Sequence, residues 1–187
     1  MTTEQKKKLL FVGAEAMPFA ATGGLGDVLG SLPAAIAAAD PEADVRVVLP
    51  LYGQVKGEWR EKMTKLTEFT VTLSWRQQYC GVFSLVKDNV TYYFIDNEYY
   101  FKRASLYGEF DDGERFAFFC RAVLEMMEKL CYYPDILHAN DWQSALSVVY
   151  LKTDYSYRNE KYAAIKTVFT IHNIEYQGQY DFAILQD

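Results

Sequence analysis

Residues 15–36, EAMPFAATGGLGDVLGSLPAAI, decide the fold of this chain. The hydrophobic run 9–14 precedes them, and an apolar segment at helical spacing follows three closely spaced glycines. This order predicts a buried strand, a glycine loop and a helix to about Ala39, bent or broken at Pro33. Glycine allows positive φ in such a loop, and the free N–H groups of the first helical turn suit an anion such as a phosphate or sugar diphosphate.

Beyond this stretch, buried strands alternate with helices. We expect strands at 44–49, 135–139 and 165–171, and helices at 112–130 and 141–152. The alternation predicts an α/β fold: a Rossmann-like, doubly wound, mainly parallel sheet with helices on both faces. Residues 66–95 differ, since three β-rich runs predict an antiparallel hairpin region there. Residues 97–112 predict a long loop, of the kind that is often functional.

Two helix starts are predicted from capping residues. Asp112 is expected to cap the helix whose apolar stripe runs from Phe116 to Leu130. For the next helix, Asn140 with Gln143 three residues later fits a capping box. That assignment leaves the carboxylate of Asp141 to point at a cleft.

The amino-acid composition restricts the classes of function that the chain can have. The 187 residues suffice for one domain, and half of them are hydrophobic, which indicates a globular chain. A net charge of −6 without a strong basic cluster disfavours nucleic acid, and no apolar run reaches membrane-spanning length. Cys80, Cys120 and Cys131 are odd in number and widely spaced, so we expect reduced, buried cysteines in a cytoplasmic protein.

The glycine loop fits the known nucleotide motifs badly. From Gly24 the sequence reads GLGDVL, so the third glycine of a dinucleotide fingerprint is absent, and the second strand ends Leu49-Pro50 without an acidic residue. No Gly-Lys-Ser/Thr follows, which excludes a Walker A loop. Alone, the loop is as compatible with a tight turn as with an anion site.

The two histidines give a second indication of a site. His138 and His172 are expected at the ends of two strands, beside Asp141 and Asn173. Ligands bind outside the carboxyl ends of the strands in a doubly wound sheet, so both histidines and the glycine loop should converge on one edge. A buried, hydrogen-bonded histidine is the alternative for each. We expect no metal, because two histidines and scattered cysteines do not form a zinc ligand set.

Aromatic and amide side chains surround these positions. Trp142 is either part of the core or a stacking platform for a sugar ring. The segment 172–180, HNIEYQGQY, is rich in amides and aromatic rings. Planar polar groups beside aromatic faces suit a carbohydrate, which offers hydroxyls on its edge and C–H groups on its face.

Three segments, ATGGLGDVLGSLP, HANDWQSAL and FTIHNIEYQG, together resemble the family of bacterial glycogen synthases and plant starch synthases. The resemblance covers the whole chain in order. It implies one half of a GT-B architecture, with residues 1–187 as the N-terminal, acceptor-side domain and a C-terminal nucleotide-sugar domain absent from this chain. The implied reaction is a retaining transfer of glucose from ADP-glucose to the non-reducing end of an α-1,4-glucan (glycogen or a maltooligosaccharide). It requires no metal or other cofactor, and neither nucleic acid nor membrane.

The resemblance also assigns roles to residues. His172 is expected to contact the transferred glucose and, with Asp141, to be catalytic. Thr22, Gly23 and Gly24 are expected to approach the donor diphosphate. The residues expected on the acceptor side are Glu15, Asp27, His138, Trp142, Asn173, Tyr176 and Gln177.

One position departs from the family pattern. Ala21 precedes Thr22, where the family usually has a lysine that would neutralise phosphate charge, and this leaves the choice of donor open. Two other functions remain as alternatives: a non-catalytic glucan-binding module and, less favoured, a dinucleotide oxidoreductase.

Overall fold

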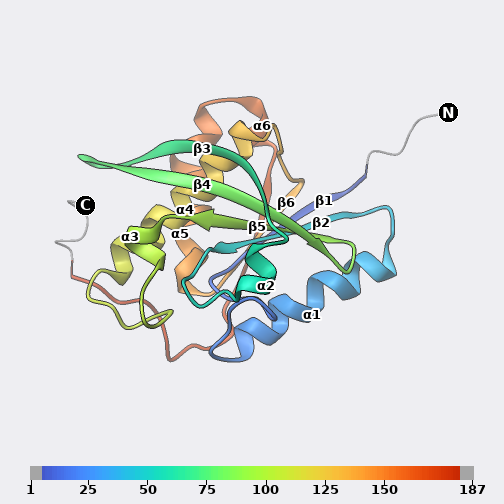
Figure 1. The fold of residues 1–187 in the computed structure, drawn as a ribbon. Helices are drawn as coiled ribbons and strands as arrows, with labels where there is room; N and C mark the ends of the chain where they lie inside the picture. The colour runs from blue at the N-terminus through green and yellow to red at the C-terminus, as the bar shows by residue number, and fades with distance from the viewer. Residues whose placement is uncertain (1–5, 182–187) are drawn as a thin grey trace.

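A seven-stranded sheet forms the centre of the computed structural model, which describes residues 6–181 (Figure 1). Its strand order is β3-β4-β5-β2-β1-β6-β7. The parallel strands are β1 (Lys8–Val12), β2 (Asp44–Pro50), β5 (Val90–Asp96), β6 (Ile136–Asn140) and β7 (Lys166–Thr170). The antiparallel part consists of β3 (Thr64–Leu73) and β4 (Arg76–Lys87), which join the sheet through β5. The mainly parallel sheet and its antiparallel region are confirmed.

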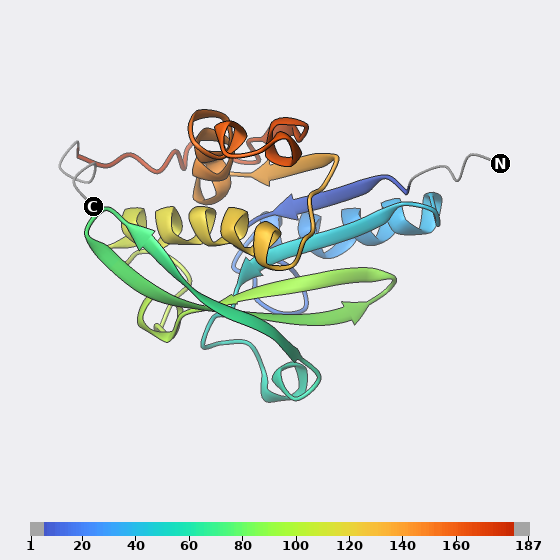
Figure 2. The ribbon, with the colours of Figure 1, turned by 90° about the horizontal axis from the view of Figure 1, so that it is seen from above.

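Helices cover the two faces of this sheet. Helix α1 (Gly24–Ala39) lies on one face, and α4 (Asp112–Lys129) and α5 (Trp142–Thr153) lie on the other (Figures 1 and 2). The crossover through α1, from β1 to β2, runs in the opposite direction along the sheet to the crossovers through α4 and α5, so right-handed connections place these helices on opposite faces. The shorter elements are α2 (Gly57–Arg60), α3 (Glu98–Phe101), α6 (Glu160–Ala163) and a 3-10 turn, Tyr155–Tyr157. The doubly wound α/β fold is therefore confirmed.

The hydrophobic core contains residues of the sheet and of the helices on both of its faces, with a large share from α4. The apolar stripe of α4 is buried as predicted, at Phe116, Phe119, Cys120, Val123, Leu124 and Met127, whereas Leu130 is only partly buried. Each such side chain contributes about 1.5–3 kcal/mol when it is removed from water. Helix α1 continues through the buried Pro33 to Ala39, so the break that proline suggested does not occur.

Both capping predictions are wrong. Asp111, not Asp112, is the N-cap of α4, and its side chain makes no capping hydrogen bond. Asp112 instead pairs with the buried Arg115. Asn140 is the last residue of β6 and its amide donates to main-chain carbonyl oxygens, so no capping box forms. In both places another partner takes the polar side chain: Arg115 of the same helix for Asp112, and main-chain carbonyl oxygens of β1 and β6 for Asn140.

The three cysteines are free, but only two of them are buried. Cys80 and Cys120 lie in the core, while Cys131 is exposed just after α4 at φ 50°. The prediction of three buried cysteines is therefore wrong at this position.

The strand order defines where a ligand can bind. β1 lies between β2 and β6, so the chain first extends the sheet to one side of β1 and later to the other. The connections that follow β1 and β6 therefore diverge and leave a crevice at the carboxyl ends of these strands.

Candidate functional site

A cleft of about 1120 Å³ opens at this switch point. Four segments line it: the loop after β1 with the start of α1, the 102–111 loop with the start of α4, the start of α5, and the segment 172–180. All the predicted site residues except two lie here: Glu15, Thr22, Gly23, Gly24, Asp141, Trp142, His172, Asn173, Tyr176 and Gln177. The structure thus brings together three segments that the sequence placed on one edge.

Asp27 and His138 are the two that do not line the cleft. Asp27 is exposed on α1. His138 lies within β6 rather than at its end, with its ring 5.0 Å from that of Phe11 and its Nε2 2.7 Å from Thr170 Oγ1. Its side chain belongs to a face of the sheet, which corresponds to the alternative of a hydrogen-bonded structural histidine.

The carboxylate of Glu15 is the main polar anchor of the cleft. It is 3% exposed and accepts hydrogen bonds from the N–H of Thr22 at 2.6 Å, the hydroxyl of Thr22 at 2.8 Å and the N–H of Gly23 at 3.2 Å. A fourth bond, of 2.7 Å, comes from the hydroxyl of Tyr107. Glu15 therefore holds the glycine loop in place with its own charge, beside the N-terminus of α1.

The glycine loop has an extended backbone at Gly23 and free space beside Gly23 and Gly24. Gly23 has φ −161°, an extended conformation, so positive φ is not the reason for glycine at this position. A Cβ at Gly23 or Gly24 would meet no atom within 4 Å, whereas one at Gly26 would lie 2.3 Å from the Cβ of Ala21. Gly26 thus permits close packing of the loop on α1, and Gly23 and Gly24 leave room for a ligand.

Asp141 has a strained backbone. Its φ of 58° and ψ of 174° lie in a region that residues other than glycine seldom adopt. Its Oδ1 accepts a hydrogen bond of 2.7 Å from the N–H of His172. The side chain thus links the start of α5 to the segment after β7, and it lies in the cleft without a capping role.

His172 is oriented by Asn140, which the sequence predicted as a helix-capping residue. Asn140 donates from Nδ2 to the carbonyl oxygens of His138, at 2.9 Å, and Val12, at 3.4 Å. Its Oδ1 is therefore the acceptor, 3.0 Å from Nε2 of His172. A neutral His172 consequently carries its proton on Nε2. The buried position of Asn140 at the end of a parallel strand, next to the strand that leads to His172, is the signal that could have identified it.

His138 and His172 also interact electrostatically. Burial, and to a smaller extent the proximity of His172, lowers the pKa of His138 below its ordinary value. His138 therefore remains neutral at neutral pH and supports the strand edge without a charge.

Trp142 is partly covered. Its ring packs edge-on against Phe116 at 5.2 Å and lies 5.6 Å from the ring of Tyr180. Gly178 has φ 60°, and a Cβ there would lie 2.4 Å from the indole ring. The backbone of the 172–180 segment thus crosses the indole closely, so Trp142 combines a core contact with a position in the cleft.

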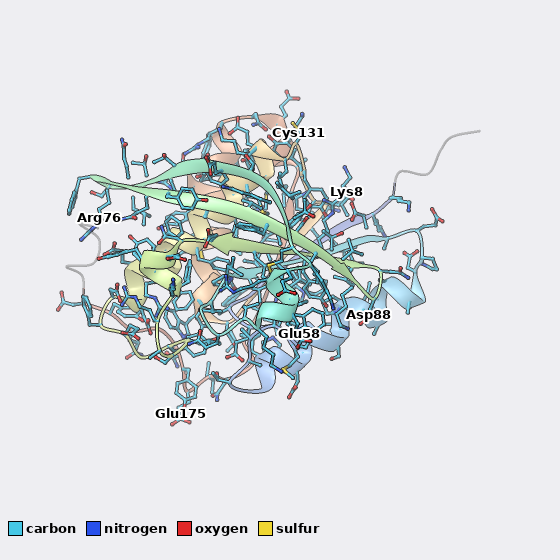
Figure 3. The ribbon with its side chains drawn as sticks, viewed as in Figure 1. Lys8, Glu58, Arg76, Asp88, Cys131 and Glu175 are labelled. Atoms are coloured by element: carbon cyan, nitrogen blue, oxygen red, sulfur yellow. The ribbon has the colours of Figure 1, made fainter. Side chains whose placement is uncertain are left out.

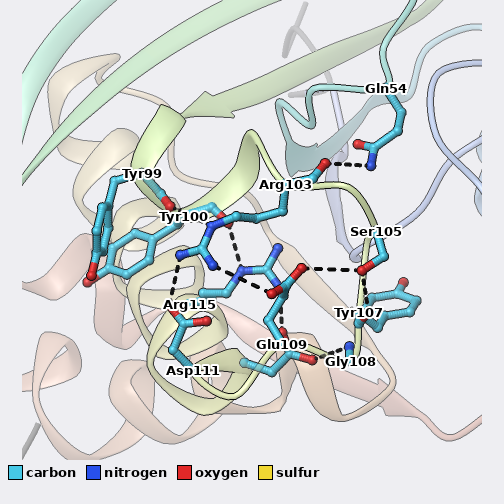
Figure 4. Close-up of polar contacts among 11 residues, drawn as sticks. Gln54, Tyr99, Tyr100, Arg103, Ser105, Tyr107, Gly108, Glu109, Asp111 and Arg115 are labelled. Carbon is cyan, nitrogen blue, oxygen red and sulfur yellow. Dashed lines mark hydrogen bonds and ion pairs between the residues drawn. The ribbon is translucent and has the colours of Figure 1, made fainter.

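The 102–111 loop contributes Tyr107 and Gly108 to the cleft lining, and Figure 4 shows the polar contacts that hold this loop. Arg103 bonds to Asp111 at 2.9 Å, and the N–H of Gly108 donates to Asp112 at 2.8 Å. The fully buried Arg115 pairs with Asp112 and donates from Nε to the carbonyl of Tyr100 at 2.7 Å. Burial, mainly, raises the pKa of Tyr107, so its hydroxyl remains a donor to Glu15.

A family profile described as "Starch synthase catalytic domain" matches residues 8–187. The chain belongs to this family. It is 52% identical over 178 residues to the glycogen synthase of Ligilactobacillus salivarius, which covers 95% of this chain and 37% of that protein. It is 49% identical over 181 residues to the glycogen synthase of Geobacillus stearothermophilus, covering 96% and 36% of the two chains.

A solved member of the family has the same fold. The catalytic domain of starch synthase IV from Arabidopsis thaliana, described as bound to ADP and acarbose, aligns with a TM-score of 0.86 at 28% identity, over 96% of this chain and 36% of that chain. This chain therefore spans little more than a third of the length of the relatives that it matches.

The charged side chains that line the cleft in this family member are all acidic within the described residues. Within residues 6–181, the lining includes the carboxylates of Glu15, Asp112, Asp141 and Glu175 but no lysine or arginine. The same part of the chain contains no cluster of three or more His, Cys, Asp and Glu side chains that could hold a metal ion. It also contains no helix long and apolar enough to cross a membrane. This lining therefore offers negative charge and no cationic side chain to a ligand, which makes it poorly suited to phosphates.

Proposed function

We propose that the chain forms the acceptor-side wall of a glucosyltransferase cleft. Glucose would pass from ADP-glucose to the non-reducing end of an α-1,4-glucan, glycogen or a maltooligosaccharide, with retention. Residues 1–187 would belong to the N-terminal, acceptor-side domain of a GT-B enzyme, and a C-terminal domain would supply the opposite wall. The family membership, the relatives that are glycogen synthases and the fold of the starch synthase support this proposal.

The assignment of donor and acceptor binding to different domains rests on the absence of Lys and Arg from the described cleft lining. A sugar diphosphate that leaves with two negative charges requires cations or amide donors. On this wall Glu15 already accepts the N–H groups of Thr22 and Gly23, which leaves the next amides of α1 for a phosphate. Most of the diphosphate stabilisation must therefore come from the opposite domain, while this wall would face the acceptor glucan.

Within this wall, Asp141 and Asn140 position His172. Asp141 holds its N–H and Asn140 holds its Nε2, so the imidazole is fixed from two sides. A fixed ring at the strand end can contact the transferred glucose where charge develops in the transition state. The free cysteines favour a cytoplasmic enzyme.

The test is incorporation of labelled glucose from ADP-glucose into glycogen. The chain would be joined to the C-terminal part of the Geobacillus stearothermophilus glycogen synthase, to which it is 49% identical over the shared region. We expect the chimera to transfer glucose and the chain of residues 1–187 alone to transfer none. His172→Ala in the chimera should reduce turnover at least about a hundredfold, as the loss of one transition-state contact does.

Two results would contradict the proposal. Robust transfer by residues 1–187 alone would mean that the donor site lies within this chain. A folded chimera that binds maltooligosaccharides but gives no transfer from any nucleotide-glucose would favour the alternative, a non-catalytic glucan-binding module.

A further inference from the structure

The outer face of the β3–β4 ribbon carries exposed aromatic, amide and hydroxyl side chains. Side chains alternate along both strands, and Val71, Leu73 and Cys80 point to the core. The exposed positions that alternate with them are Thr70 and Thr72 on β3, and Gln77 and Tyr79 on β4, with Trp75 at the turn. Thr70 pairs with Tyr79 and Thr72 with Gln77 across the ribbon. We name these five residues the ribbon face.

We propose that the ribbon face is a second glucan-binding surface, which holds the polymer outside the cleft. This inference rests on the proposed function for the identity of the polymer. It stands on the position and surroundings of the two aromatic rings and on the local balance of charge.

The side chain of Tyr79 lies along the surface of the ribbon. Its hydroxyl lies 2.6 Å from the position that a Cβ of Gly81 would occupy, so the ring extends over the glycine. The hydroxyl is 3.5 Å from Oε2 of Glu68, and Nζ of Lys65 is 5.8 Å from the ring centroid. The side chain is 44% exposed even though it is held on several sides. Glycine at position 81 thus provides the space for a ring on the strand surface.

Trp75 stands at the tip of the ribbon with 74% of its side chain exposed. The guanidinium of Arg76 lies 4.4 Å from its ring centroid, and Nε of Arg76 is 3.4 Å from Glu114 on α4. The indole is therefore anchored to the domain through its neighbour. Tyr79 follows four residues later, so the Cα atoms of the two residues lie no more than about 14 Å apart. This spacing allows both to stack on the sugar rings of one polymer chain.

The charges around the ribbon face are paired. Lys65 contacts Glu68 at 2.5 Å, and Arg76 contacts Glu114. What remains exposed between the rings is an amide and two hydroxyls, from Gln77, Thr70 and Thr72. An uncharged polymer with many hydroxyls matches this surface, since it needs stacking on C–H faces and neutral hydrogen-bond partners. A nucleic acid or an acidic peptide would find no unpaired cation among these residues.

The ribbon face is separate from the cleft. Figure 3 shows Arg76, at the tip of the ribbon, well apart from Glu175, which belongs to the cleft lining. A polymer held at both places would raise the local concentration of its chain ends at the cleft. The surface would therefore matter for a large glucan and not for a short oligosaccharide.

Native electrophoresis of the purified chain in gels with and without glycogen tests the proposal. The double variant Trp75→Ala/Tyr79→Ala should bind glycogen about tenfold more weakly than the unaltered chain, because two-point attachment to the polymer is lost. Tyr157→Ala is the matched control, since Tyr157 is 83% exposed and lies outside the ribbon face. It should bind as the unaltered chain does. Circular dichroism and thermal unfolding would establish that the variants are folded.

A second readout uses the chimera. The double variant should raise KM for glycogen and leave kcat and KM for maltotriose unchanged. Equal retention of the double variant and the unaltered chain would overturn the proposal. Failure of the unaltered chain to bind glycogen would overturn it as well. Transfer by the chimera would then still support the proposed function, so the two inferences can fail separately.

Discussion

Glu15 and Tyr107 are 92 residues apart in the sequence, and the hydroxyl of Tyr107 donates a 2.7 Å hydrogen bond to the carboxylate of Glu15. Through this bond the loop after β1 is joined to the 102–111 loop. Glu15 also accepts from Thr22 and Gly23, so a single carboxylate fixes the glycine loop relative to the 102–111 loop. The geometry of the cleft therefore depends on this contact.

Tyr107→Phe should lower the free energy of unfolding. The substitution removes one bond to a charged acceptor, which contributes about 1.5–3 kcal/mol. The lower end of this range applies, because Glu15 retains its other donors. Urea unfolding measures the change. Tyr99→Phe is the matched control, since Tyr99 is 62% exposed, and it should alter stability little. Equal effects of the two substitutions would show that the Tyr107 hydroxyl has no structural role.

Asp141→Gly should be more stable than Asp141→Ala by at least about 1 kcal/mol. Both variants lose the carboxylate that accepts the N–H of His172, so that loss cancels between them. They differ in the backbone at φ 58° and ψ 174°, which glycine adopts without strain and alanine does not. Chemical unfolding of both variants gives the difference. If alanine were tolerated as well as glycine, the strain at this position would be refuted.

Neutral His172 should be found with its proton on Nε2. Asn140 presents its oxygen to that nitrogen because its NH2 group is bound to the carbonyl oxygens of Val12 and His138. Two-bond ¹⁵N–¹H correlation spectra distinguish the tautomers of a labelled ring. In Asn140→Leu the preference should be lost and both tautomers should appear. An Nδ1–H tautomer in the unaltered chain would contradict the orientation of Asn140.

Sequence patterns were sufficient for the fold and for the location of the cleft. The alternation of strands and helices fixed the doubly wound sheet, and the carboxyl edge of such a sheet brought the glycine loop, Asp141 and His172 together. The family resemblance supplied the remaining site residues. The role of Glu15 as an anchor could not be read from the sequence, because its partner Tyr107 lies in a loop without a periodic pattern.

The wrong sequence predictions concern the end of a strand and two polar side chains that bind other partners. β6 extends to Asn140, one residue beyond the predicted end, so His138 lies inside the strand and its side chain belongs to a sheet face. Asn140 and Asp112 fit local capping patterns, but other partners take their side chains. Asp112 pairs with Arg115 of its own helix, whereas the amide of Asn140 donates to the carbonyl oxygen of Val12, 128 residues away. A local pattern contains no information on the second kind of partner.

Stability should fall as the pH is lowered through the range of histidine titration. The pKa of His138 is lowered in the folded chain, whereas in the unfolded chain it stays near its ordinary value of about 6.5. Below that value the unfolded state binds a proton that the folded state does not, so the free energy of unfolding decreases. Urea unfolding at about pH 7.5 and about pH 5.5 should show this loss, and His138→Gln should reduce it. His172→Gln is the control and should retain most of it, because burial lowers the pKa of His138 more than the proximity of His172 does. Identical pH dependence in His138→Gln and the unaltered chain would exclude His138 as the cause.

Ala21→Lys in the chimera should lower KM for ADP-glucose. Ala21 is exposed and precedes Thr22 at the rim of the cleft, and the described lining contains no cation. A lysine there would face the donor diphosphate, and one well-placed charge-assisted contact strengthens binding by about tenfold or more. Its carboxylate neighbour Glu15 is already occupied by four hydrogen bonds, which limits competition for the ammonium group. Ala21→Gln is the control, since it adds length without charge and should leave KM unchanged. An unchanged or higher KM in Ala21→Lys would mean that the opposite domain already supplies the cation at this position, so that the loop does not determine donor affinity.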